Sequence, residues 1–463
     1  MERPSSSAVV LGAGVAGMLA AQALSKHFGT VTLLDRRPLD ADGTFTTGVA
    51  QSDHLHVMLQ GGQFVIDRAF PGLMEECAVS PDMTNDWGPE TFWVSPFGPY
   101  PQQKTPVTTW QFSRKILDRR MLKRLMALPN VSVRSAKVRG LVGEPGRITG
   151  VEVDLPEAEG PTVLHADLVA DCRGRNSPLV KELVGLGYPE PPITRVDNQL
   201  GYASQFFQLP EGETATWKLT YLQAREGIHD RGGALCAYAD GSLIAILIGY
   251  GDDRPTADPQ EFLAFARSLP RAEVFADLER AQPVGNPKIW RNLGNCRRHF
   301  GRMARWPRGL IALGDAACHF NPVYGQGMTV SAIEAEALDK LLAGTPDPRS
   351  QPWERAFQQK LERLVLVPWT RSVTEDQRSR QANPSLPTRV LQGYVDQVLR
   401  GAVQDPVLHS AFLRVMHMVS SPASLFSPPI LARVMARSAG RRLRPPPAEG
   451  VHLLPTPEHV NSR

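Results

Sequence analysis

Two glycine-rich segments, about 300 residues apart, constrain the fold of this chain more than any other feature of its sequence. The first spans residues 9–17 and reads Val-Val-Leu-Gly-Ala-Gly-Val-Ala-Gly. The second begins with Gly-Asp-Ala-Ala at residues 314–317 and ends with Gly-Gln-Gly at residues 325–327. Each segment alone fits many kinds of turn. Together they predict a domain that holds one dinucleotide by two separated stretches of backbone.

The first segment has the order of a dinucleotide-binding turn. An apolar run at residues 8–11 suits a buried parallel strand, and residues 15–24 continue at helical spacing. Glycines in the G-x-G-x-x-G spacing allow a tight turn, a close approach of pyrophosphate and close packing of helix on strand. The phosphates would meet the positive end of the helix. We therefore expect cofactor contacts at Gly12, Gly14, Ala16 and Gly17.

A second apolar run, residues 31–34, ends at Asp35, which lies 23 residues after Gly12. A carboxylate at the tip of this strand can accept hydrogen bonds from both ribose hydroxyls of an adenosine and would repel a 2′-phosphate. The site therefore suits FAD or NAD better than NADP. Arg36, the next residue, is included among the expected cofactor contacts.

The second segment predicts where a flavin ring would lie. An apolar strand, residues 309–313, leads into Asp315, whose carboxylate is placed to accept a hydrogen bond from a ribityl hydroxyl. Free N–H groups at the start of the following helix can face the pyrimidine edge of the ring and stabilise negative charge there. The cofactor contacts expected in this segment are Gly314, Asp315, Pro322, Gly325, Gly327 and Met328.

Composition excludes several other classes of protein. The net charge is only +4 and the basic residues are dispersed, so nothing indicates nucleic-acid binding. No apolar stretch approaches the roughly 18 residues that span a bilayer. The first strand begins by Ala8 and leaves no room for a signal peptide, so we expect a soluble, cytoplasmic protein. The five cysteines form no C-x-x-C pair and are expected to be reduced thiols.

The predicted fold class is α/β: a Rossmann-like FAD-binding domain of the GR2 type, an inserted substrate domain rich in β-sheet, and a helical C-terminal region. The cofactor domain is expected to be discontinuous, because apolar strand and helix patterns resume after an aromatic-rich, strand-like stretch. The expected boundaries are 1–190 plus 290–350 for the cofactor domain, 191–289 with about 85–110 for the substrate domain, 351–440 for the helices, and 441–463 for a disordered tail.

With these motifs, the chain resembles the single-component FAD-dependent monooxygenases typified by para-hydroxybenzoate hydroxylase. It is most similar to the squalene-epoxidase-like and polyether-type polyene epoxidases of natural-product pathways. The resemblance runs from Ala8 to about Leu342 and includes Ser113-Arg114-x-x-Leu117. It implies that Arg114 contacts the FAD pyrophosphate or ribityl chain.

The middle motif of this family departs from its usual form here. Gly174 and Ser177 keep the spacing, but Arg173 stands in place of an Asp and Val180 in place of an Arg. Asp171, three residues before the glycine, is included with Gly174 among the expected cofactor contacts. Because the missing groups can help to recruit NADPH, the reductant stays open between NADPH, NADH and a separate reductase.

The catalytic residues are left unknown, with three candidates near the flavin ring: Gln51, His54 and Tyr324. Structural capping and core packing are equal alternatives for Gln51 and His54. His54 and His56 resemble a metal-binding pair, but no third ligand is near in the sequence, so no metal site is predicted.

The resemblance implies reduction of FAD by NADPH or NADH, reaction with O₂, and oxygen transfer from a flavin hydroperoxide to a small, apolar, electron-rich substrate. Olefin epoxidation of a polyene or isoprenoid in secondary metabolism is the first expectation, and hydroxylation of a phenol, quinoline or polyketide ring is the alternative. An FAD-dependent prenyl reductase and a non-catalytic flavin or nucleotide sensor stay open. A halogenase is disfavoured, because the Trp-x-Trp-x-Ile-Pro motif is absent from the sequence.

Apolar residues of the C-terminal region follow helical spacing, at positions 412, 415, 416 and 419 and again over 425–435. Ordinary packing of amphipathic helices is the favoured interpretation. The more specific interpretation is that these residues form the wall of a pocket for a polyene, or a surface in peripheral contact with a membrane. The oligomeric state is left open.

Overall fold

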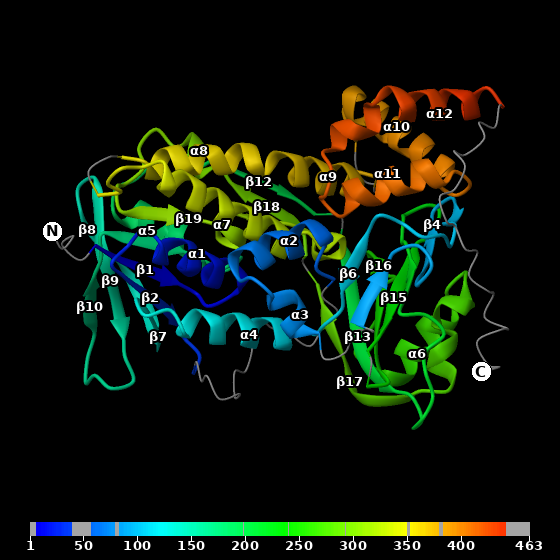
Figure 1. Cartoon of the computed structure of the whole chain (residues 1–463), viewed down its shortest axis with the longest axis horizontal. Coiled ribbons are helices and arrows are strands. Elements are labelled where there is room, and N and C mark those ends of the chain that lie inside the picture. Colours follow the sequence, from blue (N-terminus) through cyan, green and yellow to red (C-terminus); the bar gives the residue numbers. More distant parts are fainter. Residues whose placement is uncertain are drawn as a thin grey trace.

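The structure is a computed structural model that describes residues 6–38, 57–78, 83–197, 199–238, 240–291, 293–349, 352–378 and 383–440. Two sheets lie at opposite ends of an elongated molecule, and helices of the C-terminal region lie above the second sheet (Figure 1). The candidates Gln51 and His54 lie outside the described residues.

The first sheet has five strands, and all of its pairs are parallel. Parallel neighbours require a connection that crosses from one end of the sheet to the other. Its strands, in spatial order, are β19 (Leu310–Ala312), β11 (Leu168–Asp171), β1 (Ser7–Leu11), β2 (Thr30–Asp35) and β7 (Val131–Ser135). Strands β1 and β19, far apart in sequence, are therefore separated by only one strand. This order brings the two glycine-rich turns to the same edge of the sheet.

Both faces of the parallel sheet are buried. Along β1, Val10 packs against one core and Val9 and Leu11 against another, because successive side chains point to opposite faces. The first face is covered by α1 (Val15–Ser25), α2 (Gln60–Ala69), α3 (Leu73–Cys77), α4 (Arg114–Met126), α7 (Gly327–Ala343) and α8 (Glu354–Leu364). The second is covered by α5 (Leu179–Gly185) and an antiparallel sheet of β8 (Lys137–Glu144), β9 (Arg147–Asp154) and β10 (Thr162–His165).

The second large sheet has seven strands and is mixed: β14 pairs with β4 in parallel, and the other pairs are antiparallel. In spatial order they are β17 (Gln282–Trp290), β13 (Leu200–Gln208), β16 (Ser242–Tyr250), β15 (Arg231–Ala237), β14 (Leu219–Leu222), β4 (Thr91–Ser95) and β5 (Gly98–Pro99). One face packs against α6 (Pro259–Arg267) and η2 (Ala272–Glu279). Asp258 begins α6 as its N-cap, with Pro259 at the first turn.

The C-terminal region is helical, as predicted. Its helices are α9 (Leu366–Asp376), α10 (Leu386–Ala402), α11 (Pro406–Met416), η6 (Pro422–Phe426) and α12 (Pro428–Ser438). Apolar residues of α10, α11 and α12 share a core with Trp93 of β4 and Ile244 of β16. The predicted fold class is thus confirmed: a parallel sheet, β-rich additional sheets and a helical C-terminal region.

Short elements complete the chain and connect the two halves. They are β3 (Thr84–Asp86), β6 (Thr108–Trp110), β12 (Ile193–Val196), β18 (Asn295–Arg298), η3 (Phe300–Arg302), η4 (Gly314–Ala316), β20 (Cys318–His319) and η5 (Pro322–Tyr324). Strand β18 pairs with both β12 and β20, which places the flavin segment beside the connection between the halves. All five cysteines are buried free thiols.

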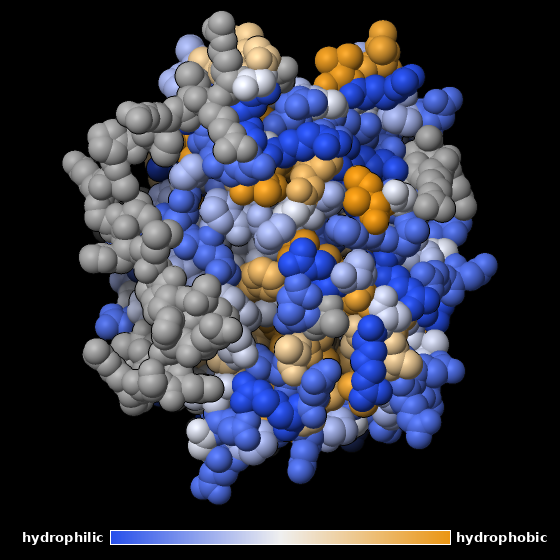
Figure 2. Space-filling view, turned by 90° about the vertical axis from the view of Figure 1, so that its right-hand side faces the viewer, coloured by the Kyte–Doolittle hydropathy of each residue, from blue (hydrophilic) through white to orange (hydrophobic). Residues whose placement is uncertain are grey.

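Exposed apolar side chains occur on the C-terminal helices, notably Leu386 and Val390 of α10 and Met435 of α12. On the face at this end of the molecule, apolar residues form separate patches between hydrophilic ones (Figure 2). Of the helices in the described ranges, none has the length and apolar character that a membrane crossing needs. Peripheral membrane contact stays a prediction.

Candidate functional site

The turn between β1 and α1 leaves no room for a side chain at Gly12 or Gly17 but is open at Gly14. Gly12 has φ +97°, and a Cβ there would lie 2.6 Å from the carbonyl oxygen of Cys172. A Cβ on Gly17 would lie 1.8 Å from the carbonyl oxygen of Gly12. A Cβ on Gly14, by contrast, would meet nothing within 4 Å. The open space at Gly14, at the start of α1, is where a pyrophosphate would approach the backbone.

The second glycine-rich segment contacts the first. Gly314 has φ +65°, and a Cβ there would lie 2.6 Å from the Cβ of Ala16 in α1. Farther along, a Cβ on Gly327 would lie 3.9 Å from Oδ1 of Asp315. The chain therefore brings its two predicted cofactor segments together, with Asp315 and the start of α7 beside each other.

Arg298 of β18 joins the turn at Gly174 to the flavin segment. Its Nη1 donates to the carbonyl oxygens of Asp315 and Ala316, both at 3.1 Å, and its Nη2 donates to the carbonyl oxygen of Arg175 at 2.7 Å. A single guanidinium fork thus fixes two loops that the sequence separates widely. Gly174 itself has φ +77° and open space around it.

Arg114 is the first residue of α4, and its side chain extends to the first turn of α7. Its side chain is buried, with Nε 2.5 Å from Oδ1 of Asp118 and Nη1 3.1 Å from the sulfur of Met328. Burial raises the pKa of Asp118, and the Arg114 charge opposes that rise. The contact with Met328 places Arg114 beside the start of α7, where its predicted role with the cofactor would require it.

Asp35 is at the tip of β2, as predicted, but its carboxylate already has partners. Oδ2 accepts from the N–H of Ala13 at 2.8 Å, and both oxygens accept from the guanidinium of Arg37, at 2.8 and 2.7 Å. A carboxylate offers about four acceptor positions. Binding of a ribose at Asp35 therefore requires Arg37 to move. Arg36 is exposed, and its contact with the cofactor stays a prediction.

Asp171 lies beneath the turn at Gly174 and does not face open space. It is fully buried, and its oxygens accept from the N–H, Nε and Nη2 of Arg173 and from the hydroxyl of Ser177. Arg173 also donates to Glu182. Asp171 therefore supports the turn through Arg173 and Ser177, and its direct contact with the cofactor stays a prediction.

Several buried polar atoms around the flavin segment lack partners among the described residues. They are His319 Nδ1, Gln326 Oε1, Thr329 Oγ1 and Glu334 Oε1. Because buried polar groups are almost always hydrogen-bonded, these atoms are expected to take partners from water or from a bound polar molecule. The first-turn N–H groups of α7 face the same region. These residues fit an FAD isoalloxazine and ribityl chain, and the space at Gly14 fits its pyrophosphate.

Burial sets the charges of this region. Burial lowers the pKa of His319 to about 3, assisted by the Arg175 and Arg298 charges, so this imidazole is neutral. Burial raises the pKa of Glu334 to about 8, opposed by the N–H of Gly314, which donates to it at 2.5 Å. Burial also raises the pKa of Asp315, while nearby arginines, Arg175 first, oppose the rise.

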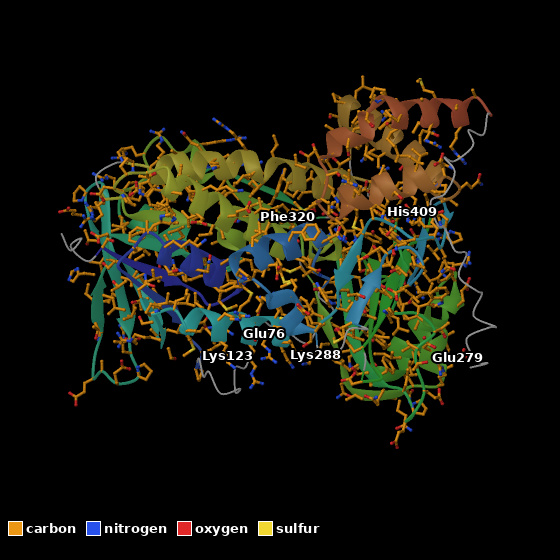
Figure 3. All side chains as sticks on the ribbon, in the orientation of Figure 1. Glu76, Lys123, Glu279, Lys288, Phe320 and His409 are labelled. Atoms are coloured by element: carbon orange, nitrogen blue, oxygen red, sulfur yellow. The ribbon has the colours of Figure 1, made fainter. Side chains whose placement is uncertain are left out.

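The flavin segment reaches the junction of the two halves of the molecule. Phe320, in this segment, lies at that junction, whereas His409 lies in the C-terminal helical region (Figure 3). Farther along, the hydroxyl of Tyr324 donates to Oδ1 of Asp376 in α9 at 2.6 Å. Asn295 and Asn321 donate to the same carboxyl group. Burial raises the pKa of Asp376 to about 6, and these three hydrogen bonds, that of Tyr324 first, oppose the rise.

A small cavity, with a volume of about 30 Å³, adjoins Tyr324 at this junction. The seven-stranded sheet, α9 and η5 contribute its walls, which include Leu200, Tyr221, Arg225, Tyr250, Tyr324 and Asp376. This lining is more polar than a site for a plain hydrocarbon would be. The C-terminal apolar residues do not line it: Phe412 packs 5.6 Å from Trp93 and 5.7 Å from Tyr100, centroid to centroid, and Val415 and Met416 are buried in the same core. The favoured interpretation of that segment, helix packing, therefore holds for these residues.

Side chains that the sequence did not single out hold this site together. Arg298 and Asp376 lie on a strand and a helix with no motif around them, and Arg225 follows an ordinary strand. The dipeptide Asn321-Pro322 was the one available signal, because Asn before Pro favours a turn. No group of potential metal ligands occurs in the part of the chain that the structure describes.

The turns at Gly12–Gly17, at Gly174 and at Gly314–Gly327 together form a cofactor cradle, and the fold and this cradle define an FAD-binding protein. Residues 5–347 match the family described as FAD binding domain, and the chain belongs to that family. It is 30% identical to Protein Rv3254 of Mycobacterium tuberculosis over 455 residues, which cover 94% of each chain.

Solved structures with the same fold include enzymes of different chemistry. The flavin-dependent brominase Bmp2 is 14% identical with a TM-score of 0.65, covering 94% of this chain and 98% of its own. CabE, an aromatic hydroxylase from angucycline biosynthesis, is 17% identical with a TM-score of 0.55, covering 89% of this chain and 76% of its own. At these identities the likeness shows the fold alone, so the epoxidase subgroup stays a prediction.

Proposed function

We propose that this protein is an FAD-dependent monooxygenase that transfers one oxygen atom of O₂ to an unsaturated, electron-rich natural-product intermediate. Epoxidation of a carbon–carbon double bond is the first expectation. The observation that carries the proposal is the position of Tyr324. It belongs to the flavin segment and lines the cavity, so a substrate group that reaches that cavity would lie beside the cofactor.

Within the proposal, the cradle residues hold FAD. The turn at Gly12, Gly14 and Gly17 takes the pyrophosphate, Asp315 the ribityl chain, and the N–H groups at the start of α7 the pyrimidine edge. Bound FAD, reduced by NADPH or NADH, supplies the activation of O₂. The protein itself must orient the substrate and exclude water.

The cavity walls perform those two tasks. Tyr221, Tyr250 and Tyr324 offer ring surfaces against which a planar unsaturated group can lie. The hydroxyl of Tyr324 is held by Asp376, so it cannot rotate freely. Burial among these groups keeps bulk water away from the face of the flavin segment that the substrate would approach.

Aromatic hydroxylation is the second candidate, and one observation favours it. Attack on a phenol is helped by a base near its hydroxyl, and the Tyr324–Asp376 pair lies at the cavity wall with a carboxyl pKa of about 6. Ionised Asp376 could accept a proton through Tyr324. No such base is needed for an epoxidation.

The test is turnover of the FAD-loaded protein with NADPH or NADH in air, against a panel of polyenes and phenols. Oxygen uptake and a product heavier by one oxygen atom support monooxygenation. Product analysis by NMR then separates an epoxide from a phenol. Addition of two hydrogens without oxygen uptake would instead identify a prenyl reductase, and absence of any flavin reduction would identify a sensor. The Gly14→Ala variant is the control for reaction outside the cradle.

A further inference from the structure

Helix α2 begins without a capping side chain of its own. Its N-cap residue is Leu59, whose side chain cannot accept a hydrogen bond, and no acidic residue lies in its first turn. The N–H of Gln60 donates instead to Nδ1 of His417 at 3.3 Å, and the N–H of Gly61 donates to the carbonyl oxygen of His417 at 2.9 Å. A residue of the C-terminal region, 357 positions after Gln60, therefore caps α2.

The imidazole of His417 is fully buried and keeps an acceptor for this bond. Its ring lies 4.2 Å from that of Trp87, centroid to centroid, at an interplanar angle of 73°. Burial lowers the pKa of His417 well below its usual value, and the Arg371 charge adds to this effect. The ring is therefore neutral, and the bond from Gln60 places its hydrogen on Nε2 rather than on Nδ1.

The turn that carries His417 ends α11 in an unusual conformation. Met418 has φ +56°, in the region that glycine normally occupies at this position of a helix end. The N–H groups of Met418 and Val419 donate back to the last turn of α11, at 3.1 and 2.9 Å. The side chain of Met418 packs against a cluster that contains Phe320 of the flavin segment and Val330 of α7. The turn thus contacts the flavin segment directly.

Two glycines of α2 allow close contact on both sides of its first turn. A Cβ on Gly61 would lie 2.6 Å from the carbonyl oxygen of Met418. A Cβ on Gly62 would lie 2.4 Å from Oγ1 of Thr329, in the first turn of α7. The start of α2 therefore lies between the C-terminal turn and the helix whose first N–H groups are expected to face the flavin.

The side chains of α2 bind a third element, β6. Nε2 of Gln60 donates to the carbonyl oxygen of Thr108 at 2.9 Å, and the side chain of Gln63 both donates to and accepts from the backbone of Trp110, at 3.0 and 2.9 Å. These bonds hold α2 along β6 but leave its first N–H groups free to bond elsewhere. Among the described residues, those N–H groups, of Gln60 and Gly61, donate to His417.

We infer that His417 is a positioning residue for the flavin: it caps α2, and α2 in turn holds the first turn of α7 where the flavin ring requires it. His417 acts through α2 and not by contact with the cofactor. The inference rests on the FAD-binding part of the proposed function and deepens it. It makes the C-terminal helical region, which also packs against the seven-stranded sheet, part of the scaffold of the flavin site.

The experiment compares two substitutions of His417 in the FAD-loaded full chain. His417→Asn keeps an acceptor near the position of Nδ1 and loses the ring. His417→Phe keeps a ring against Trp87 and loses the acceptor. His417→Phe should change the absorption spectrum of bound flavin and weaken FAD binding about 5-fold in equilibrium dialysis, as expected for the loss of one hydrogen bond. His417→Asn should bind FAD within about 2-fold of wild type.

Hydrogen–deuterium exchange locates the change in the chain. In His417→Phe, the start of α2 and the first turn of α7 should exchange faster than in wild type, with and without FAD. His409→Phe is the matched control, because His409 is a buried imidazole on the same helix, stacked 4.8 Å from Tyr100. Neither of its ring nitrogens has a hydrogen-bond partner among the described residues. This control should leave the flavin spectrum and the exchange of α2 and α7 unchanged.

Equal effects of His417→Asn and His417→Phe would show that ring packing matters and the acceptor does not, and would overturn the inference. So would faster exchange at α2 without any change at α7, or an unchanged flavin spectrum in His417→Phe. If His417→Phe does not fold, His417→Gln replaces it with the same expectations, because its acceptor lies one bond farther from the backbone. Failure of wild type to bind FAD would contradict the proposed function, whereas exchange at α7 without FAD still decides whether His417 positions that helix.

Discussion

The cofactor cradle and the adjoining cavity are built in opposite ways. In the cradle, backbone atoms meet so closely that a Cβ at Gly12, Gly17 or Gly314 would overlap a neighbour. Around the cavity, buried charged side chains are held by hydrogen bonds and ion pairs: Arg225 pairs with Asp396, and Asp376 accepts from Tyr324. The cradle should therefore be sensitive to added atoms, and the cavity to changes of charge or of hydrogen-bonding capacity.

The largest effect is expected from Gly17→Ala. Its new Cβ would lie 1.8 Å from the carbonyl oxygen of Gly12, so the turn cannot form without rebuilding. We expect a loss of more than about 4 kcal/mol of unfolding free energy, seen as insoluble or non-cooperatively unfolding protein.

Gly14→Ala is the matched control, since the same methyl group there meets nothing within 4 Å. Its unfolding free energy should stay within about 0.5 kcal/mol of wild type, while FAD binds at least about 10-fold more weakly because the methyl group occupies phosphate space. Equal stability of the two variants would contradict the description of the turn.

Next in size is Arg298→Ala, which removes the donor for three carbonyl oxygens of two loops. A hydrogen bond from a charged donor contributes roughly 1.5–3 kcal/mol, so a loss of roughly 3 kcal/mol is expected in urea unfolding. FAD affinity should fall as well, because the loops are part of the cradle. Arg231→Gln, which removes an exposed ion pair with Asp253, should cost less than about 0.5 kcal/mol.

Glu334→Gln tests a buried carboxyl group of the cradle that accepts a hydrogen bond from the backbone N–H of Gly314. Because the folded pKa of about 8 is above the unfolded value of 4.5, wild-type stability contributed by Glu334 is lost as pH rises between these values. The variant keeps an acceptor for Gly314 and loses this dependence. The free energy of unfolding of the variant, relative to that of wild type, should therefore rise by a few kcal/mol between pH 5 and pH 9, as expected for a pKa difference of this size.

Urea unfolding at several pH values measures this difference. Glu336→Gln, on the same helix but half-buried and paired with Arg68 and Lys340, is the control and should show no such gain. A stability difference between Glu334→Gln and wild type that is constant with pH would mean that Glu334 is ionised in the folded protein at neutral pH.

Tyr324→Phe should have the smallest effect of the set. It removes one hydrogen bond to Asp376, worth roughly 1.5–3 kcal/mol when the carboxyl group is ionised. That bond lowers the pKa of Asp376. The free energy of unfolding of wild type should therefore increase relative to that of the variant as pH rises above about 6. If the stability difference between wild type and variant became smaller with rising pH, Tyr324 would not donate a hydrogen bond to ionised Asp376.

The two regions also differ in how far the sequence could predict them. The turns of the cradle follow from glycine spacing, and the parallel strands that carry them follow from apolar runs, so both were predictable. Arg37 on Asp35 and Arg173 on Asp171 were not, because each depends on where one side chain folds back. The cavity was not predictable either. Its walls come from β13, β14, β16, η5 and α9, and no local pattern indicates that Arg225, Glu375 and Asp396 meet.

The most direct test of the central claim is titration of the purified full chain with FAD, followed by absorbance and by equilibrium dialysis. The convergence of the turns at Gly14 and Gly314 predicts one FAD per chain, a perturbed flavin spectrum, and weakened binding in Gly14→Ala. A wild-type protein that binds no FAD, or a Gly14→Ala variant that binds it as tightly as wild type, would contradict the account.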